Sequence, residues 1–510
     1  MAKQWYISSG SPARDGNLIQ PLVDGEETWL DILPVIKDAK ETIHMAFWMM
    51  HLDHELDRPT SLEFREPTDR YKNTLQAVLL AKQQVGVTIR VLLWVPSTIP
   101  AAESEVLKLV AQSMVPGSIA GLEVGAALAS IAFILDLRIL KYGVEGKFEV
   151  LLEQHPTHQI GSWHQKSIIV DGKIAYVGGM NARQNDWDSK HSVFDYRRMP
   201  HTSTASERMK SRDRKAATEY APRHDFMTRI EGGLVMDVQN NFISRWNRAI
   251  DQKNFLYRRL TKLSAVTTPP KSSGSKSGQV TRTMPKYPVT PMGEIGCFEM
   301  YVKAIQNAEK YIYIEDQYFR SDRIAQELAK ACSNNPELLL VVVTPPDYLG
   351  QWEEQKLALA SPSTYWTADS FKIIKAVSPE FCLFYLQVND MDARGAQLFI
   401  EVDTHAKLMI VDDEWYTIGS CNINERGFLY EGEMNIGVHN PADAFSLRKR
   451  LWSEHLQVTC PDDIVKATRL WFVHAIENHK AAKEKRKPLS RVFGFSQHGP
   501  LLPMIPKTLF

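Results

Sequence analysis

Hydrophobic and polar positions in the first half of the chain follow two alternating spacings. Residues 30–39 carry apolar side chains at the spacing of one helix face, and the apolar run TIHMAFWMM that follows predicts a strand. A second helix is predicted around 72–85, and VTIRVLLWV at 87–95 predicts the next strand. Helices and strands that alternate in this way are typical of α/β layer structures.

The same alternation returns in the second half, after a change of composition. Residues 263–291 are rich in Pro, Ser, Gly and Lys, which predicts a flexible linker. Beyond it, the runs YIYIEDQYF, ELLLVVVTPP and HAKLMIVDD predict strands. We therefore expect a first lobe at 1–262, the linker, a second lobe at 292–460, and a C-terminal helix and tail at 461–510.

The two halves repeat one another. Segments 164–181 and 405–422 align without a gap and agree at seven of 18 positions, where chance would give about one. The agreement extends upstream, because Ile36, Ala39 and Ile43 have the same spacing as Ile305, Ala308 and Ile312. Two copies of one α/β unit predict a pair of α/β/α sandwich lobes related by a pseudo-two-fold axis, with the active site at their interface.

Each copy holds the same polar side chains. A histidine and a lysine stand two residues apart in a strand and share one of its faces, and an asparagine follows the next glycine turn. If the copies face each other, six side chains converge: His164, Lys166, Asn181, His405, Lys407 and Asn422. The repeat therefore favours one shared catalytic site over two solvated strand edges.

These residue types suit phosphoryl transfer. Ammonium and amide groups are donors for an anionic centre, and two histidines permit a double displacement through a phosphohistidine. Each imidazole needs an acceptor at its other nitrogen, and the candidates are Asp225 and Glu433, although either could be a surface carboxylate. Asp171 and Asp412 are interpreted as turn or salt-bridge residues. Because no carboxylate cluster has metal-ligand spacing, we expect metal-independent catalysis without a cofactor.

The complete pattern, HxKxxxxD followed by GGxN or GSxN, resembles that of the phospholipase D superfamily and occurs twice. Its members are His164, Lys166, Asp171, Gly178, Gly179 and Asn181, then His405, Lys407, Asp412, Gly419, Ser420 and Asn422. VDGEETW, HDFMTRIEGGLVMDVQNNFISRW and YIYIEDQYF also look like segments of true phospholipases D. The resemblance implies that His164 is the nucleophile, oriented by Glu433, and that His405 is the general acid, oriented by Asp225. Asp195, beside a polar and basic insertion at 196–223, is the rival of Asp225.

The resemblance also implies an activity and a partner. A phospholipase D would hydrolyse the distal phosphodiester of glycerophospholipids such as phosphatidylcholine, giving phosphatidic acid and the head group, with transfer to alcohols. The alternatives are another superfamily phosphodiesterase or phosphatidyltransferase, of the nuclease or cardiolipin-synthase type, and a non-catalytic scaffold, against which the intact motifs argue. We expect a monomer that contacts a membrane surface or micelle peripherally, through the apolar segments 118–140 and 493–510 and the basic insertion.

Composition narrows these expectations further. The 510 residues include 60 basic and 60 acidic ones, which disfavours a nucleic-acid partner. Five cysteines without paired spacing predict neither a disulfide framework nor a zinc site. The apolar run at 124–135 is too short to span a bilayer. We see no segment that resembles a signal peptide or a calcium-binding targeting domain, so we expect a cytoplasmic protein or one exported by a signal-independent route.

Overall fold

The computed structural model describes residues 3–96, 136–157, 161–189, 191–210, 213–252, 260–286, 293–346, 360–378 and 381–494. The apolar run at 124–135 and the tail after residue 494 lie outside the described residues. Within the described helices, none combines the length and the apolar character that a membrane-crossing segment needs.

The described residues of the first half build a seven-stranded sheet. Hydrogen-bonded neighbours follow the order β1-β8-β6-β5-β2-β3-β4. Strands β2, β3 and β4 are parallel, and the others pair antiparallel. The strands are β1 (Arg14–Val23), β2 (Thr42–Phe47), β3 (Thr88–Trp94), β4 (Glu149–Glu153), β5 (Lys166–Val170), β6 (Ile174–Gly178) and β8 (Phe226–Glu231).

The second half builds a sheet with the same order. Its strands pair as β9-β20-β18-β17-β11-β13-β14, so each has a counterpart in the first sheet. Antiparallel pairing of β1 with β9 joins the two sheets edge to edge. The strands are β9 (Lys276–Met284), β11 (Tyr311–Asp316), β13 (Leu339–Val343), β14 (Cys382–Met391), β17 (Lys407–Val411), β18 (Trp415–Gly419) and β20 (Glu433–His439), with β10 (Glu294–Ile295), β15 (Gln397–Glu401) and β21 (Val492–Gly494) at the margins.

The predicted flexible linker at 263–291 is wrong for residues 276–284. These residues form β9, the counterpart of β1, and most of the strand is buried. Its partners along its two edges are β20 and β1, with β10 beside its end. Pairing with several strands outweighs the weak strand propensity of its Ser, Gly and Lys residues. The second sheet therefore begins inside the segment whose composition suggested a linker.

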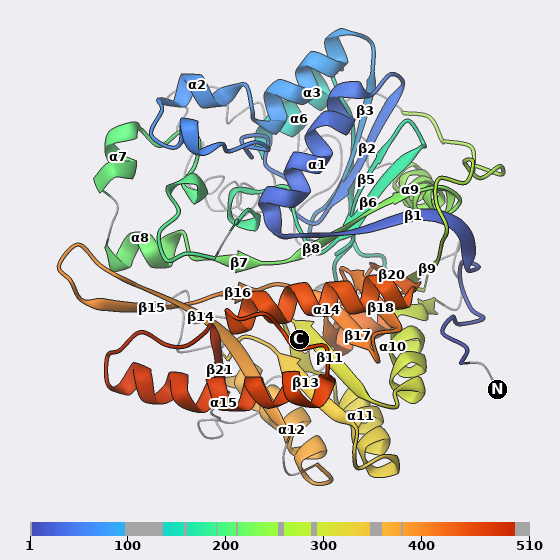
Figure 1. The fold of residues 1–510 in the computed structure, drawn as a ribbon. Helices are drawn as coiled ribbons and strands as arrows, with labels where there is room; N and C mark the ends of the chain where they lie inside the picture. The colour runs from blue at the N-terminus through green and yellow to red at the C-terminus, as the bar shows by residue number, and fades with distance from the viewer. Residues whose placement is uncertain are drawn as a thin grey trace.

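Helices cover both faces of each sheet (Figure 1). One apolar cluster packs α1 (Asp24–Asp38), α3 (Leu75–Gln84) and α6 (Leu137–Val144) on the first sheet, and another packs α10 (Gly296–Asn307) and α11 (Asp322–Asn334), beside α12 (Ala360–Lys375), on the second. The other face of each sheet is covered by a third cluster, which both halves share. It contains residues of α9 (Leu234–Asp251) from the first half and of α14 (Pro441–Leu456) and α15 (Ile464–Lys483) from the second. Each half is thus an α/β/α sandwich, and the predicted fold class is confirmed.

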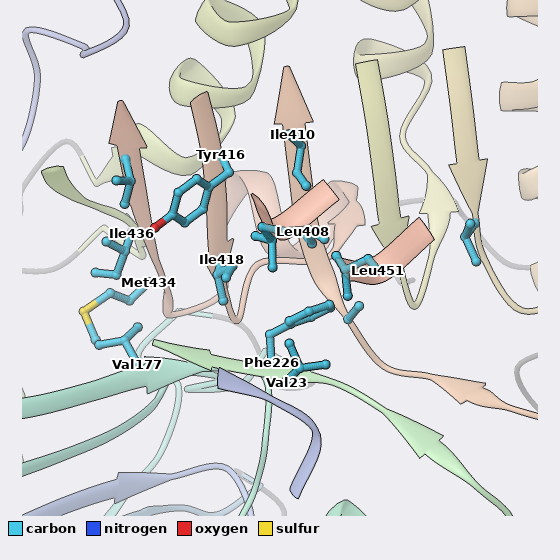
Figure 2. Packing of buried hydrophobic residues seen from close by; sticks show 14 of the residues in the cluster. Val23, Val177, Phe226, Leu408, Ile410, Tyr416, Ile418, Met434, Ile436 and Leu451 are labelled. Atoms are coloured by element: carbon cyan, nitrogen blue, oxygen red, sulfur yellow. The ribbon is translucent and has the colours of Figure 1, made fainter. Parts of the chain in front are cut away.

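The cluster shared by the two halves also runs directly between them (Figure 2). Val177 and Phe226 of the first half meet Met434, Leu408 and Ile418 of the second, and all five side chains are buried. Burial of large apolar side chains contributes roughly 1.5–3 kcal/mol each, so this contact fixes the halves relative to one another. Two short strand pairs form small separate sheets: β7 (Arg223–His224) pairs with β16 (Asp403–Thr404), and β12 (Phe319–Arg320) pairs with β19 (Ile423–Asn424).

The polar insertion at 196–223 is not wholly a surface loop. It contains α7 (Ala205–Lys210) and α8 (Arg214–Glu219), with η3 (Tyr196–Arg198) at its start. Arg198 and Arg208 are buried. Arg198 donates to Asp188, and Arg208 donates to the carbonyl groups of Pro200 and Arg65. Arginine side chains are usually exposed, but guanidinium groups with carboxylate and carbonyl acceptors are stable in the interior.

Candidate active site

Strands β5 and β17, which follow the two motif histidines, begin at the interface between the halves. His164 and His405 lie two residues before the first residues of β5 and β17, Lys166 and Lys407. Both histidines and both lysines are buried. His164 Nδ1 lies 3.1 Å from the carbonyl oxygen of Ser420, in the second copy of the motif. The structure thus places the first histidine against the second motif.

Each imidazole is hydrogen-bonded to an acid from the opposite half. His164 Nδ1 lies 3.0 Å from Glu433 Oε1, and His405 Nδ1 lies 2.6 Å from Asp225 Oδ2. A carboxylate at Nδ1 holds that nitrogen as the donor and leaves the lone pair on Nε2. Within the described part of the chain, neither Nε2 has a hydrogen-bond partner. Both rings are therefore oriented to react through Nε2.

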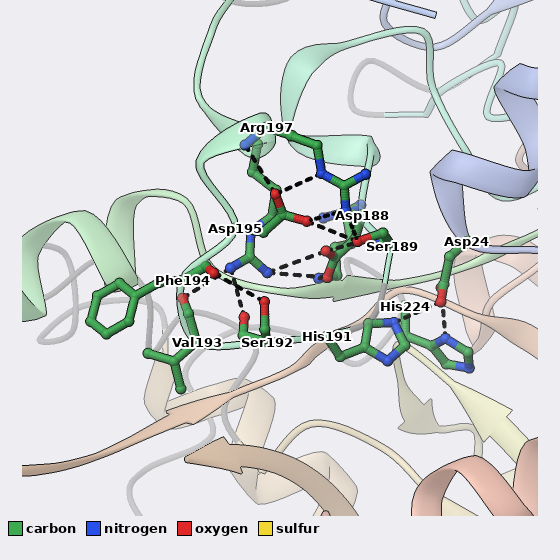
Figure 3. Close-up of polar contacts among 12 residues, drawn as sticks. Asp24, Asp188, Ser189, His191, Ser192, Val193, Phe194, Asp195, Arg197 and His224 are labelled. Carbon is green, nitrogen blue, oxygen red and sulfur yellow. Dashed lines mark hydrogen bonds and ion pairs between the residues drawn. The ribbon is translucent and has the colours of Figure 1, made fainter. Parts of the chain in front are cut away.

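The rival acid, Asp195, lies elsewhere. Its carboxylate accepts hydrogen bonds from the hydroxyl of Ser189 and from the guanidinium and backbone N–H of Arg197 (Figure 3). Asp195 therefore caps η3 and anchors the insertion, while the acid that contacts His405 is Asp225.

The main chain repeats the crossed pairing of the side chains. The N–H of His164 donates to the carbonyl of Gly432 at 2.8 Å, and the N–H of His405 donates to the carbonyl of His224 at 2.7 Å. Each acceptor directly precedes the acid that orients the same ring. Each histidine is therefore held at both its backbone and its ring by one dipeptide of the opposite half.

The glycine turns leave room for the two acids. A Cβ at Gly179 would overlap Oδ1 of Asp225, and one at Gly178 would overlap the carbonyl oxygen of Phe226. At the position equivalent to Gly179, the hydroxyl of Ser420 donates to Glu433. Only a residue without a side chain, or a small donor, fits against the buried carboxylate, which explains GG in one copy and GS in the other.

Both lysines are tied to the histidine beside them. Lys166 Nζ donates to the carbonyl of His164 at 2.5 Å, and Lys407 Nζ donates to the carbonyl of His405 and, at 3.0 Å, to Gln317 Oε1. Burial lowers the pKa of Lys166 to about 7 and lowers that of Lys407 as well. An anion bound beside them would stabilise both ammonium groups, so the pair suits an anionic ligand.

The remaining titratable groups respond to the same burial. It lowers the pKa values of His164 and His405 well below the ordinary value, and the neighbouring lysines add to the effect. Burial raises the pKa of Asp225 to about 7 and, together with the charge of Glu431, raises that of Glu433 well above its usual range. The imidazoles are therefore neutral before an anion binds, as a nucleophile requires.

The two asparagines have unused hydrogen-bonding groups. Asn181 Oδ1 accepts from the N–H of Met49 at 3.1 Å. The Nδ2 of Asn181 and the Oδ1 of Asn422 are buried and have no hydrogen-bond partner within the described residues. Because buried polar groups are normally satisfied, these amides are available to a ligand.

Comparisons with known proteins agree with the motifs. A family model described as phospholipase D matches residues 138–331, and one described as cardiolipin synthase, PLD-like domain, matches residues 301–454. The chain belongs to the phospholipase D superfamily. Each of these two family matches contains one HxKxxxxD motif, so the resemblance inferred from the sequence is confirmed.

Curated relatives in the superfamily are longer than this chain. Phospholipase D A of Dictyostelium discoideum is 24% identical over 500 residues, which cover 87% of this chain and 36% of the relative. Phospholipase D gamma 1 of Arabidopsis thaliana is 22% identical over 571 residues, which cover 87% and 64%. The chain therefore spans about one to two thirds of the length of these relatives. Among solved structures, phosphatidylserine synthase of Haemophilus influenzae Rd KW20 aligns with a TM-score of 0.49 and 12% identity, over 92% of this chain and 95% of that one.

The aspartates of the superfamily motif lie outside the reacting centre. Asp171 and Asp412 have left-handed backbones, with φ of 51° and 59°. The carboxylate of Asp171 accepts three backbone N–H groups at 2.8–2.9 Å, and that of Asp412 does the same in the other half. The donors are Lys40, Glu41 and Thr42 at the start of β2, and Glu309, Lys310 and Tyr311 at the start of β11. These aspartates tie each motif strand to its neighbour.

Sequence reasoning missed two residues of the site. The ring of Trp48 lies edge-on to His164 with 5.6 Å between centroids, and Gln317 accepts from Lys407. Trp48 follows β2, and Gln317 follows its counterpart β11. The upstream repeat that pairs Ile43 with Ile312 also pairs these two positions. Extending that alignment past the strand ends, where α/β sites form, would have found both.

Among the described residues, three groups of buried side chains place histidines and carboxylates near one another. They are Asp186, Asp225 and His405; Asp24, His191 and His224; and His224, Glu315 and His455. The closest N···O separations are 2.6, 2.7 and 2.8 Å. Two ligands of one tetrahedral zinc ion would be about 3.4 Å apart. The shorter separations favour direct hydrogen bonds between histidine and carboxylate.

Proposed function

We propose that the chain is a phospholipase D, which hydrolyses the distal phosphodiester of glycerophospholipids such as phosphatidylcholine to phosphatidic acid and the free head group. The observation that carries the proposal is the crossed pair of imidazole–carboxylate hydrogen bonds, His164 with Glu433 and His405 with Asp225. The names of the curated relatives support this reaction within the superfamily.

The first half-reaction forms a phosphohistidine. The Nε2 lone pair of His164 attacks phosphorus, and the bond from phosphorus to the head-group oxygen breaks. Glu433 stabilises the positive charge that develops on the ring, through Nδ1. His405 gives its Nε2 proton to the departing oxygen, and Asp225 holds the imidazolium beforehand. The bound phosphate, an anion beside a buried imidazole, favours protonation of His405 in the complex.

The second half-reaction returns the enzyme to its starting state. His405, now neutral, takes a proton from water, and the water oxygen attacks phosphorus. The bond between phosphorus and His164 Nε2 breaks, which releases phosphatidic acid. An alcohol that replaces water gives the exchanged phospholipid by the same step.

Lysine and asparagine groups would hold the phosphoryl oxygens. The ammonium groups of Lys166 and Lys407 offset the charge of the transition state, and the free Nδ2 group of Asn181 can donate to an equatorial oxygen. These donors supply charge stabilisation without a metal, and we therefore propose metal-independent catalysis with no cofactor. Because one chain carries both motifs, we also propose that a monomer acts on lipid at a membrane surface or in a micelle.

The test is incubation of the protein with phosphatidylcholine and ethanol. We expect release of choline and formation of both phosphatidic acid and phosphatidylethanol, with both products lost in His164→Ala and His405→Ala. His439→Ala is the matched control, because His439 lies six residues from Glu433 along β20, about 20 Å away, and is exposed. If the wild type forms neither product from phosphatidylcholine or from other head groups, the proposal fails.

A further inference from the structure

A buried imidazole lies directly before the acid that orients His405. His224 Nδ1 is 2.7 Å from Asp24 Oδ1, and His224 Nε2 is 2.9 Å from Glu315 Oε2. The His224 side chain is fully buried. An imidazole with a carboxylate oxygen beside each nitrogen is stabilised as an imidazolium, because only that form carries a proton on both.

This imidazolium joins the two halves of the molecule. Asp24 follows β1 of the first half, and Glu315 lies in β11 of the second. The group extends to His191, whose ring nitrogens lie 2.8 Å from Asp24 and 3.0 Å from Glu454, and to His455, which lies 2.8 Å from Glu315. Figure 3 shows the His191 and His224 rings beside Asp24. Asp24 has a left-handed backbone with φ of 61°, a conformation that costs energy in most residues.

The charges of the group agree with this arrangement. Burial alone would lower the pKa of His224, but Asp24 and Glu315 raise it well above the ordinary value. Burial has the same opposing effect at His191, where Asp24 and Glu454 raise the pKa to about 9. Each imidazolium is therefore balanced by carboxylates from both halves.

His224 and the residue after it both contact His405 directly. Its carbonyl accepts from the N–H of His405 at 2.7 Å, and the next residue, Asp225, accepts from His405 Nδ1 at 2.6 Å. The backbone N–H of Asp225 also lies 3.3 Å from Asp24 Oδ1. A displacement of the His224 peptide would therefore move both the backbone and the ring of His405.

In the described part of the chain, the dipeptide that holds His164 carries no imidazole. The residue that corresponds to His224 is Gly432, which precedes Glu433 and accepts from the N–H of His164. A Cβ at Gly432 would overlap the ring of Trp163, so no side chain fits there. The two histidines of the pseudo-symmetric site are thus held by different means, and among the described residues a buried imidazolium precedes only the acid that orients His405.

We propose that His224 is a positioning residue for His405, because its imidazolium, hydrogen-bonded to Asp24 and ion-paired with Glu315, fixes the dipeptide that aligns the general acid. This inference rests on the proposed function, in which His405 protonates the leaving group. Proton transfer requires hydrogen-bond distance between His405 Nε2 and the leaving oxygen, and a shift of about 1 Å is enough to impair such a step.

The test compares two leaving groups. Choline leaves as a basic alkoxide that needs a proton, whereas p-nitrophenol leaves without one. We expect His224→Gln to lower the single-turnover rate of choline release from phosphatidylcholine about 10- to 100-fold, and the single-turnover rate of p-nitrophenol release less than about threefold. Single turnovers are compared because hydrolysis of the phosphohistidine, in which His405 takes the proton from water, is common to both substrates. His455→Gln is the matched control, since His455 contacts the same Glu315 but has no backbone contact with His405. It should leave the ratio of the two single-turnover rates unchanged.

Equal losses on both substrates, or no loss in folded protein, would overturn the inference. If His224→Gln does not fold, the double variant His224→Gln/Glu315→Gln removes one charge of each sign and is measured in the same way. A wild type that cleaves neither substrate contradicts the proposed function instead. The inference is then decided by the downfield proton resonance of His405 Nδ1–H, assigned by its loss in His405→Gln. The resonance should shift or broaden in His224→Gln, and an unchanged resonance rejects the positioning role.

Discussion

Asp225 Oδ2 accepts a hydrogen bond from His405 Nδ1 at 2.6 Å, although the two residues are 180 positions apart in the chain. Glu433 binds His164 in the same way but in the opposite direction between the halves. The histidine of each half is therefore oriented by an acid that the other half supplies. The apolar cluster between the sheets and the ion pair between His224 and Glu315 hold the halves at the separation that these pairs need.

Asp225→Asn should reduce turnover strongly while the protein remains folded. An amide at this position cannot stabilise the imidazolium of His405, and loss of assisted general acid catalysis corresponds to about 100-fold in kcat. The measurement is kcat for choline release, with thermal denaturation as the test of folding. Asp195→Asn is the control, because the side chain of Asp195 is also largely shielded from solvent but binds Ser189 and Arg197. If Asp195→Asn lowers kcat as much as Asp225→Asn does, the assignment of Asp225 is wrong.

Gly179→Ala should damage catalysis through Asp225. The new Cβ would overlap Oδ1 of Asp225, so the carboxylate must move away from His405 or the turn must shift. Overpacking of this kind typically costs 1–3 kcal/mol in stability, and we expect at least about a tenfold loss in kcat as well. Gly494→Ala serves as the comparison, since its nearest neighbour would be 3.7 Å away. Normal kcat in Gly179→Ala would show that the close approach has no catalytic role.

The residues of this site that occur in both copies of the motif could be predicted from the sequence. His164, Lys166, His405 and Lys407 could be placed together because two copies of one motif imply two facing strands. The order of the strands in each sheet could not be predicted, since strand pairing depends on contacts between distant segments. β9 was missed for that reason, because its stability comes from pairing with β1 and β20 rather than from its own composition.

Contacts between residues that are not repeated in the two halves also could not be predicted from the sequence. Asp24, His191, His224 and Glu315 lie in four separate segments, and no spacing or repeat in the sequence shows which of them are partners. Trp48 and Gln317 are an intermediate case. Their positions correspond in the repeat, but their types differ, so identity alone gave no signal.

His191→Gln should change how stability depends on pH. Burial opposes the charged form, but Asp24 and Glu454 raise the pKa of His191 from 6.5 to about 9, so the folded state binds this proton more tightly than the unfolded state. The resulting stabilisation, about 3 kcal/mol, is complete below pH 6.5 and is lost as the pH rises to 9. The free energy of unfolding of the wild type should fall across this window more steeply than that of His191→Gln. Parallel pH profiles in urea denaturation would contradict the assignment.

Asp171→Asn should separate stability from chemistry. The left-handed backbone at this position suits asparagine as well as aspartate, so the turn itself is retained. In the wild type, three backbone N–H groups donate to the two charged carboxylate oxygens of Asp171. The neutral amide of asparagine offers them one acceptor oxygen, and unsatisfied donors cost about 1–3 kcal/mol. We expect a lower free energy of unfolding, with kcat per folded molecule within about threefold of the wild type. Lys173→Gln, two residues further along the same turn, is the control and should change neither quantity. If kcat in Asp171→Asn falls by a factor of 100 while stability is unchanged, Asp171 takes part in the reaction rather than in holding β2 against β5.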